Sequence, residues 1–429
     1  RCVMEVTDCF GKILFINLTT GKVEKESVDR EMARTYLGGF GINQRLAHDL
    51  IKPGIAPLDP QNPIIFASGV LGGTVAPATS KMMATTKFPI TGAIGTAVGG
   101  TCGDALKQAG YGHVVVTGRA EKPVFLSIHD DEVELCNASF LRGKDTHETT
   151  DLLREQYGNQ SSVIAIGPSG EMLSPISFAF CNKMGHLGQG GLGAIMGSKN
   201  LKAILIRGTK GVEVADRRAF VAAADQVFHS IMNLNFRDDY IKIGSTIATW
   251  GRSSSRHKLT PEQEAADIYG PAAYDKRWRA TQPCPGCPIG CKFLVEIREG
   301  DHAGELSIVT GFGAPWEKFN LGSIDRTLEL RDFCNRQGLD DTTVTAIIDL
   351  VITLYENGVI TGEDTDGLEL QRDYPTVKAL TYKIARREGI GDLLAEGYAE
   401  TLKTIGRGAE EFGETFKNRF MSDPRGRHF

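Results

Sequence analysis

The sequence predicts an α+β domain over residues 1–210 and a mainly α-helical domain over residues 211–411. In the first half, short apolar runs alternate with glycine-rich turns, which is the pattern of buried strands. From residue 216 onward, apolar residues recur at the 3.6-residue spacing of helices. The pattern changes at Gly208-Thr209-Lys210-Gly211, and we place the domain boundary there.

The first domain begins with a predicted strand pair. Residues 11–18 and the segment from Val23 have strand character, and Thr19-Thr20-Gly21-Lys22 between them predicts a tight turn. Asp29 is a candidate N-cap for a helix over residues 29–50. Further buried strands are predicted at residues 64–67, 114–117, 124–128, 133–136, 163–166 and 203–206.

The second domain begins with Asp216 as the predicted N-cap of a helix that contains the apolar residues of segment 220–228. A polar, irregular stretch follows over about residues 244–291. Further helices are predicted at residues 323–337, 342–357, 376–387 and 390–405.

Charge and hydropathy exclude several classes of protein. Lys+Arg total 48 against 53 Asp+Glu, a net charge of −5 that predicts no nucleic-acid partner and no basic membrane-binding face. The first 15 residues lack the apolar core of a signal peptide, and the apolar stretch 344–355 is too short to span a bilayer. We therefore expect a cytoplasmic protein without membrane insertion.

Glycine is over-represented, with 50 of 429 residues against about 7% in typical domains. No Gly-X-Y repeat accounts for the excess. The excess predicts frequent turns or a close approach of the backbone to a bulky ligand held by loops.

Three of the nine cysteines lie in one short loop, Cys284-Pro-Gly-Cys287-Pro-Ile-Gly-Cys291. Proline and glycine keep this segment out of a helix, and closely spaced thiolates are the ligands of iron–sulfur clusters. A zinc site remains an alternative, although structural zinc usually takes two separated pairs of ligands. No fourth ligand is evident. The other six cysteines are scattered along the chain and do not predict a disulfide framework.

The segment Gly188-Gln189-Gly190-Gly191-Leu192-Gly193 matches the G-x-G-x-x-G pattern of dinucleotide-binding proteins. That pattern should follow a buried strand, and residues 181–186 do not have strand character. We expect either a close-packed glycine turn or a loop whose backbone N–H groups contact a phosphate.

The order of these motifs resembles the aldehyde:ferredoxin oxidoreductase family of tungsten-pterin enzymes, over about residues 10–410. The resemblance implies that the first domain forms two β-sheets as a base for the cofactor, and that residues 412–429 begin a truncated third domain. The matching segments are 11–21, 37–41, 57–63, 76–92, 99–100, 106–111, 118–124, 193–203 and 284–291.

The resemblance also implies the cofactors and partners. These are a tungsten bis-pterin, with molybdenum as an alternative metal, a 4Fe–4S cluster and, as a further candidate, magnesium. The substrate would be a small aldehyde or acid, and the electron partner would be ferredoxin or another iron–sulfur subunit. An oligomeric, anaerobic enzyme is expected.

Cofactor contacts follow from the matched positions. Cys284, Cys287 and Cys291 correspond to cluster ligands. The expected pterin contacts are Gly99, Gly100, Gln189, Gly190, Gly191, Asn335, Gly338, Leu339, Asp340 and Lys81.

Several positions depart from the family pattern. Lys81 and Gln189 replace arginines, so any contact from Lys81 is a point charge without the forked geometry. Asn335 replaces an aspartate but keeps an oxygen acceptor, and Ala97-Val98 replaces a polar pair.

The catalytic and metal-bridging positions depart as well. The family glutamate near tungsten falls near Thr310, so no catalytic acid or base is assigned. Glu329-Leu-Arg-Asp332 stands where some members have a metal-bridging E-x-x-H. Cys334 is a candidate fourth cluster ligand, but a buried core cysteine is the favoured interpretation.

Two alternatives therefore stay open. The departures favour an aromatic-CoA reductase catalytic subunit within the same family. A non-catalytic iron–sulfur electron-transfer or scaffold subunit is the alternative from another class.

Overall fold

The computed structural model describes residues 8–188, 190–243, 276–309, 316, 318–413 and 415–420. The chain divides into two compact units. The first contains residues 1–173, 177–234 and 283–289, and the second contains residues 174–176, 235–282 and 290–429. The loop of Cys284 and Cys287 thus groups with the first unit, although the sequence pattern places it beside the helical domain. The exact domain limits stay a prediction.

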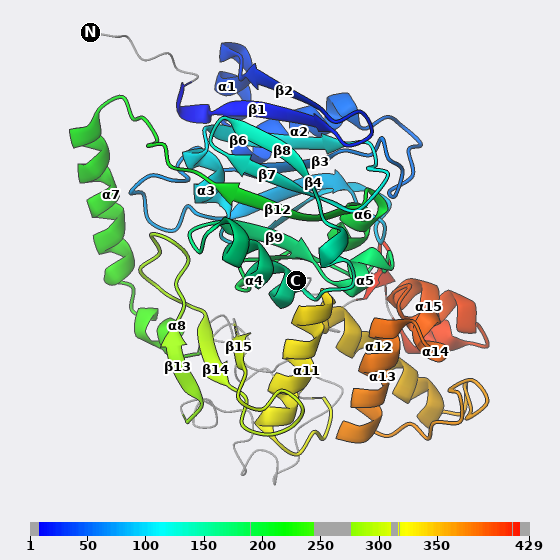
Figure 1. The fold of residues 1–429 in the computed structure, drawn as a ribbon. Coiled ribbons are helices and arrows are strands. Elements are labelled where there is room, and N and C mark those ends of the chain that lie inside the picture. Colours follow the sequence, from blue (N-terminus) through cyan, green and yellow to red (C-terminus); the bar gives the residue numbers. More distant parts are fainter. Residues whose placement is uncertain are drawn as a thin grey trace. The chain divides into compact units, whose positions relative to one another are not determined.

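The first unit contains two six-stranded sheets, as the predicted α+β class requires (Figure 1). The first sheet has the order β2-β1-β6-β3-β4-β5 and is antiparallel except for the parallel pair β1 and β6. Its strands are β1 (Lys12–Asn17), β2 (Lys22–Ser27), β3 (Ile64–Ser68), β4 (Met82–Lys87), β5 (Ile94–Gly99) and β6 (Tyr111–Thr117).

The second sheet has the order β11-β10-β9-β12-β7-β8, with β7 and β12 as its parallel pair. All six strands predicted from apolar runs are present across the two sheets, but β8 is an edge strand without a buried residue, so burial is confirmed for the other five only. The strands of the second sheet are β7 (Val124–His129), β8 (Glu132–Asn137), β9 (Ser162–Ile166), β10 (Ala179–Cys181), β11 (Gly185–Leu187) and β12 (Leu201–Arg207).

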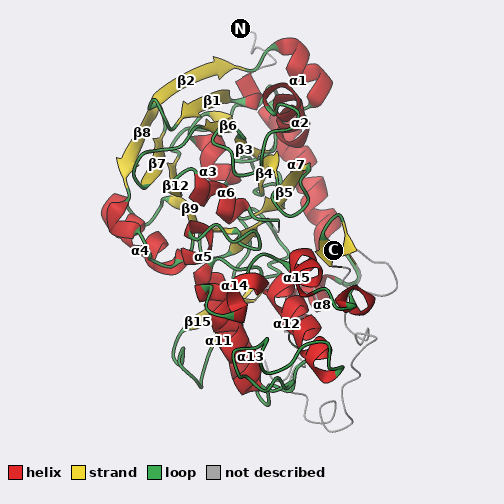
Figure 2. Cartoon of the chain, turned by 90° about the vertical axis from the view of Figure 1, so that its right-hand side faces the viewer, coloured by secondary structure: helices red, strands yellow, loops and turns green. Residues whose placement is uncertain are grey.

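The largest core of the first unit lies between these sheets. It joins apolar side chains of both sheets to those of α3 (Gly103–Gln108) and α6 (Leu192–Ser198). The opposite face of the first sheet is covered by α1 (Arg30–Tyr36) and α2 (Gly39–Leu50), and that of the second by α4 (Thr146–Tyr157) (Figure 2). The first unit also contains η1 (Asp8–Phe10), η2 (Ser139–Leu141) and α5 (Pro168–Glu171).

The predicted helix over residues 29–50 is interrupted. Asp29 caps α1 as expected, since its carboxylate accepts a hydrogen bond from the Met32 N–H (2.9 Å). Leu37 then adopts a left-handed conformation and Gly38 has φ 77°, so α2 starts afresh. A Cβ at Gly38 would lie 2.6 Å from Val70 Cγ2, which explains the glycine at this break.

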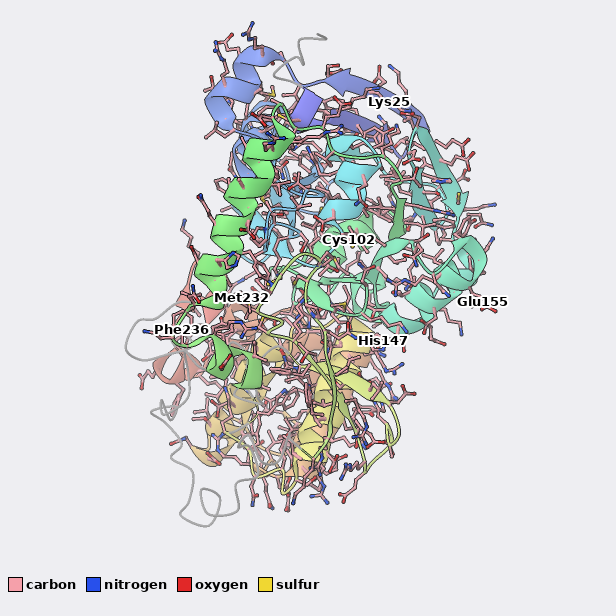
Figure 3. The ribbon with its side chains drawn as sticks, turned by 90° about the vertical axis from the view of Figure 1, so that its left-hand side faces the viewer. Lys25, Cys102, His147, Glu155, Met232 and Phe236 are labelled. Atoms are coloured by element: carbon pink, nitrogen blue, oxygen red, sulfur yellow. The ribbon has the colours of Figure 1, made fainter. Side chains whose placement is uncertain are left out.

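The helix predicted from Asp216 is α7 (Arg217–Met232). The Asp216 carboxylate accepts a hydrogen bond from the Ala219 N–H (2.9 Å), which confirms the N-cap. All side chains of α7 are at least partly exposed, and Met232 lies at its end (Figure 3).

The second unit contains the helices predicted from residue 323 onward and a three-stranded sheet that the sequence pattern did not predict, whereas α7 belongs to the first unit. The predicted helix over residues 390–405 is divided by Gly397, which has φ 102°. The elements are α8 (Arg237–Ile243), β13 (Trp278–Thr281), β14 (Phe293–Glu296), β15 (Leu306–Val309), α11 (Ile324–Gln337), α12 (Asp341–Glu356), α13 (Tyr374–Arg386), α14 (Ile390–Leu394), α15 (Tyr398–Ile405), η4 (Ala409–Phe412), β16 (Thr415–Phe416) and β17 (Arg419–Phe420). Within the described ranges, no helix has the length and apolarity needed to cross a membrane.

The buried His113 of β6 makes the stability of the first unit sensitive to acid. Its Nδ1 lies 2.8 Å from Asn43 Oδ1, and the Asn43 amide donates a hydrogen bond to the Ile65 carbonyl (2.9 Å). Burial, assisted by the charge of Lys107, lowers the pKa of His113 to about 3. In the unfolded chain the imidazole binds a proton below about pH 6.5. Stability therefore falls as the pH drops from about 6.5 toward 3, by about 1.4 kcal/mol per pH unit from this group.

We expect His113→Leu to reduce this slope. The measurement is the free energy of unfolding of the first unit, by urea titration between about pH 6.5 and pH 4.5. His129→Leu, at an exposed histidine on β7, is the matched control and should keep the wild-type slope. Equal slopes for the wild type and both variants would contradict the assignment.

Candidate functional site

The edge strands β5 and β11 bring the two sheets of the first unit into backbone contact. A Cβ at Gly99 would lie 1.7 Å from the His186 carbonyl oxygen, and one at Gly188 would lie 2.1 Å from Ala97 Cβ. Such distances exclude any side chain at either position. Both glycines are therefore required by the contact between the sheets.

The neighbouring glycines of the predicted phosphate loops are similarly enclosed. A Cβ at Gly100 would lie 2.3 Å from the Cys181 sulfur, and one at Gly190 would lie 3.2 Å from the Phe88 ring. Gly191 precedes α6 with φ 96°. The glycine-rich composition of this region thus has a structural cause in addition to the predicted phosphate contacts, which stay a prediction. Gln189 lies outside the described residues.

A group of polar side chains surrounds the start of β4. The hydroxyls of Ser68 and Ser80 are buried and have no hydrogen-bond partner among the described residues. Both serines border Gly103, because a Cβ there would lie 2.9 Å from the Ser80 carbonyl oxygen and 3.1 Å from Ser68 Oγ. Lys81 follows Ser80, is exposed, and forms no ion pair within the described part of the chain.

This group fits a polar, anionic cofactor. Buried hydroxyls without partners carry a desolvation cost that a ligand acceptor or donor would remove, and an unpaired ammonium is suited to a phosphate. The two serines were missed by the sequence analysis, because single serines near strand ends carry no periodic or motif signal.

The cysteine loop has the irregular conformation that its prolines and glycines predict. The Cys287 N–H donates to the Cys284 carbonyl (3.0 Å), and the Gly286 carbonyl, at a residue with φ 66°, accepts from the Ala78 N–H (3.2 Å). The side chains of Cys284, Cys287 and Cys291 are all half-buried. None of the described cysteines forms a disulfide.

The cysteine loop does not form a preorganised metal site. Within the described ranges, no group of three or more His, Cys, Asp or Glu side chains is arranged to hold a metal ion. The donor set nevertheless fits the chemistry of an iron–sulfur cluster, which takes thiolate ligands. Since metal binding is coupled to local folding, ligands need not converge before the cluster is present. The three cluster ligands stay a prediction.

The predicted pterin motif at the end of α11 forms a tight junction with α12. Gly338 has a left-handed conformation with φ 74°, and the Leu339 N–H donates to the Cys334 carbonyl (2.8 Å). Asp340 precedes α12 and accepts the Thr343 hydroxyl. Asn335, Leu339 and Asp340 are all buried. The motif therefore has a clear structural role, and its pterin contacts stay a prediction.

Cys334 matches the interpretation as a core cysteine. It is fully buried on α11, and burial raises the pKa of its thiol well above the usual value, reinforced by Asp341 and Asp340. A thiol whose ionisation is disfavoured is a poor metal ligand.

The carboxylates at the E-x-x-D position of α11 are neutralised within the chain. Glu329 accepts a hydrogen bond from the Lys378 ammonium (2.7 Å). Asp332 lies 3.0 Å from His302 Nδ1 and 2.6 Å from Arg336 Nε. These pairs give both carboxylates a structural role within the second unit. Thr310 lies outside the described residues.

His186 lies in an aromatic group. Its ring packs edge-on against Phe178 (4.7 Å) and stacks on Phe180 (5.1 Å), which also stacks on His147 of α4 (5.9 Å). Figure 3 marks His147, and also Cys102, which is buried at the N-terminus of α3. Packing in the protein interior is sufficient to explain the positions of His147 and Cys102.

A two-sheet base combined with a thiol loop and buried polar groups defines a cofactor-dependent redox protein. The sequence matches the aldehyde ferredoxin oxidoreductase N-terminal domain over residues 13–208 and domains 2 and 3 of the same proteins over residues 244–428. The chain belongs to the aldehyde ferredoxin oxidoreductase family.

Relatives of known name support this assignment. Tungsten-containing aldehyde ferredoxin oxidoreductases of Pyrococcus abyssi and Pyrococcus furiosus are 36% and 35% identical over 97% of this chain and 71% of their own lengths. A chain of the active-site complex BamBC of benzoyl coenzyme A reductase, solved with 1,5-dienoyl-CoA, is 26% identical with a TM-score of 0.84. This match covers 96% of the present chain but 65% of that chain.

Proposed function

We propose that this chain carries a tungsten bis-pterin and a 4Fe–4S cluster and interconverts an aldehyde and a carboxylic acid, with ferredoxin as electron partner. The observation that carries the proposal is the match to two successive regions of the family, 13–208 and 244–428. Relatives named as tungsten-containing aldehyde ferredoxin oxidoreductases add support, since they align with 97% of the chain. Molybdenum is the alternative metal, and magnesium is a further candidate ion.

Different residues of this chain would bind the iron–sulfur cluster and the pterin cofactor. Cys284, Cys287 and Cys291 would provide thiolates to the iron–sulfur cluster. Lys81 would neutralise one negative charge of the cofactor as a point contact, assisted by the hydroxyls of Ser68 and Ser80. When bound, the pterin metal centre would supply two-electron redox chemistry and the cluster one-electron chemistry.

Backbone and amide groups would complete the binding of the cofactor. The loops of Gly99-Gly100 and Gly190-Gly191 would offer backbone N–H groups to the pterin phosphates. At the α11 junction, the Asn335 amide oxygen would accept a hydrogen bond where the family has a carboxylate, and Gly338-Leu339-Asp340 would contact the pterin nitrogens. No acid or base of the described residues is assigned to proton transfer.

A second candidate function is that of an aromatic-CoA reductase catalytic subunit. The structural match to the benzoyl coenzyme A reductase complex favours it, as do Lys81 in place of arginine and the apolar pair Ala97-Val98. The sequence identity is lower than to the aldehyde enzymes, 26% against 36%, and we therefore rank it second. A non-catalytic iron–sulfur subunit is the third candidate.

The experiment is an assay of anaerobically purified, tungsten-replete protein with two substrate sets. Small aldehydes with a ferredoxin-type acceptor test the first function, and a benzoyl thioester of coenzyme A with a low-potential donor tests the second. We expect turnover with aldehydes. Turnover confined to the aromatic thioester would replace the first proposal with the second, and turnover with neither by a metal-loaded protein would favour the non-catalytic subunit.

Partner and location follow from the same proposal. The electron partner is ferredoxin or another iron–sulfur subunit in the cytoplasm, and the chain is expected to assemble as an oligomer.

A further inference from the structure

A cavity of about 280 Å³ opens in the first unit where the first sheet meets the segment after β12. Three lysines and a single carboxylate line it. These are Lys12, Lys107, Lys210 and Glu213. The lining includes parts of two segments that carried the family resemblance, 11–21 and 106–111, to which the proposed function gives no role.

Lys107 is the unusual member of this lining. Its side chain is buried, with 5% of the residue exposed, and its ammonium donates a hydrogen bond to the Cys9 carbonyl. No carboxylate of the described residues forms an ion pair with it. Burial lowers the pKa of Lys107 to about 8. A buried lysine normally has a charged partner, as Lys202 has in Glu171.

Among the residues that line the cavity, three lysines outnumber one carboxylate. Lys12 begins β1 opposite Ser27 of β2, and no ion pair of Lys12 occurs in the described part of the chain. The Lys210 ammonium forms an ion pair with the Asp131 carboxylate at 2.7 Å. The backbone carbonyl of Asp131 also accepts a hydrogen bond from the Lys25 ammonium. Figure 3 marks Lys25 on β2. Glu213 contributes the only carboxylate of the lining.

A second buried lysine, Lys199, serves as the comparison; burial lowers its pKa to about 8 as well. Lys199 is fully buried, and its ammonium donates to the carbonyls of Pro60 (2.7 Å) and Gly118 (3.4 Å). It does not line the cavity. The Lys107 ammonium has a single carbonyl partner among the described residues, which uses one of its three N–H donors, and the residue lines the cavity.

We propose that the cavity around Lys107 binds a small oxyanion of the phosphate class, held by the ammonium groups of Lys107, Lys12 and Lys210. The anion supplies the negative charge that the described residues do not provide for Lys107. Charge-assisted hydrogen bonds to an oxyanion are short and strong in a partly dehydrated cavity. The inference is independent of the redox function proposed above.

The test uses inorganic phosphate as the probe, with chloride at equal ionic strength as the reference. A ligand that binds only the folded state raises the melting temperature. We expect phosphate to raise it for the wild type, and calorimetric titration to show binding. Lys107→Met should weaken phosphate binding roughly tenfold or more, since one charge-assisted contact is worth about 1.4 kcal/mol.

Control variants separate binding from folding. Lys199→Met, which removes the other buried lysine, should lower the melting temperature but leave the phosphate response intact. If Lys107→Met does not fold, the double variant Lys12→Gln and Lys210→Gln still tests the site and should lose most of the response. Glu213→Gln should strengthen binding by removing a negative charge.

A spectroscopic measurement gives an independent result. After isotopic labelling of lysine ammonium groups, phosphate should raise the pKa of Lys107, because a nearby negative charge favours the protonated form. The proposal is overturned if phosphate and chloride affect the wild type equally, or if the phosphate response persists unchanged in the Lys107 and double variants.

Discussion

Replacing Cys287 with serine is expected to remove most of the iron from the protein and the broad visible absorbance of its cluster. Cys287 lies in a half-buried, non-helical loop with Cys284 and Cys291, and iron–sulfur clusters are bound through thiolates. A serine hydroxyl is a harder and far less acidic ligand, so the cluster should be lost or strongly destabilised. The measurement is iron and sulfide per chain after anaerobic purification.

Cys136→Ser is the matched control for this experiment. Cys136 is also half-buried but lies on β8 of the second sheet, away from the loop in sequence. Its replacement should leave the iron content at the wild-type value. Full iron retention by the Cys287 variant would show that the loop does not hold the cluster, and loss of zinc instead of iron would assign the loop to a zinc site.

Gly99→Ala is expected to destabilise the first unit by about 3 kcal/mol or more. The added methyl group would lie 1.7 Å from the His186 carbonyl oxygen, so β5 and β11 must separate. Because backbone atoms oppose it, no side-chain rotation relieves the clash. In a unit of this size the loss corresponds to several degrees of melting temperature.

Gly69→Ala provides the matched comparison. An added Cβ at Gly69 meets no atom within 4 Å, and its φ does not lie in the left-handed region. Thermal unfolding should show this variant within a degree or two of the wild type. If Gly99→Ala were as stable as Gly69→Ala, the glycine at position 99 would need another explanation, such as cofactor approach alone.

The sequence predicted those elements whose signal is local. Apolar runs gave the central strands β3, β6 and β9, whose side chains are largely buried, and Asp29 and Asp216 marked helix starts through their capping carboxylates. The strands β4 and β5 were missed, because their residues are mainly Met, Thr, Ala and Gly and carry no continuous apolar run. The expectation that residues 181–186 lack strand character was wrong: the three-residue strands β10 and β11 pair there, and β11 directly precedes Gly188.

The breaks within helices were also missed. Residues 29–50 and 390–405 keep helical spacing of their apolar residues across Gly38 and Gly397. The chain turns there because of positive φ values, which a periodic pattern does not reveal.

The features of the candidate site likewise fall into those with a signal in the sequence and those that depend on the tertiary structure. Spacing in the sequence identified the cysteine loop, and the family resemblance identified the G-L-D junction after α11. The role of Gly99 depends on His186, which is distant in sequence, and the orphan hydroxyls of Ser68 and Ser80 depend on their burial. Such tertiary features have no counterpart in a single sequence.

Elemental and pterin analysis of natively purified protein shows whether the chain carries both the pterin metal centre and the iron–sulfur cluster. We expect about four iron atoms and about one tungsten or molybdenum per chain, together with an extractable pterin. Zinc as the sole metal, with no pterin in the extract, would contradict it.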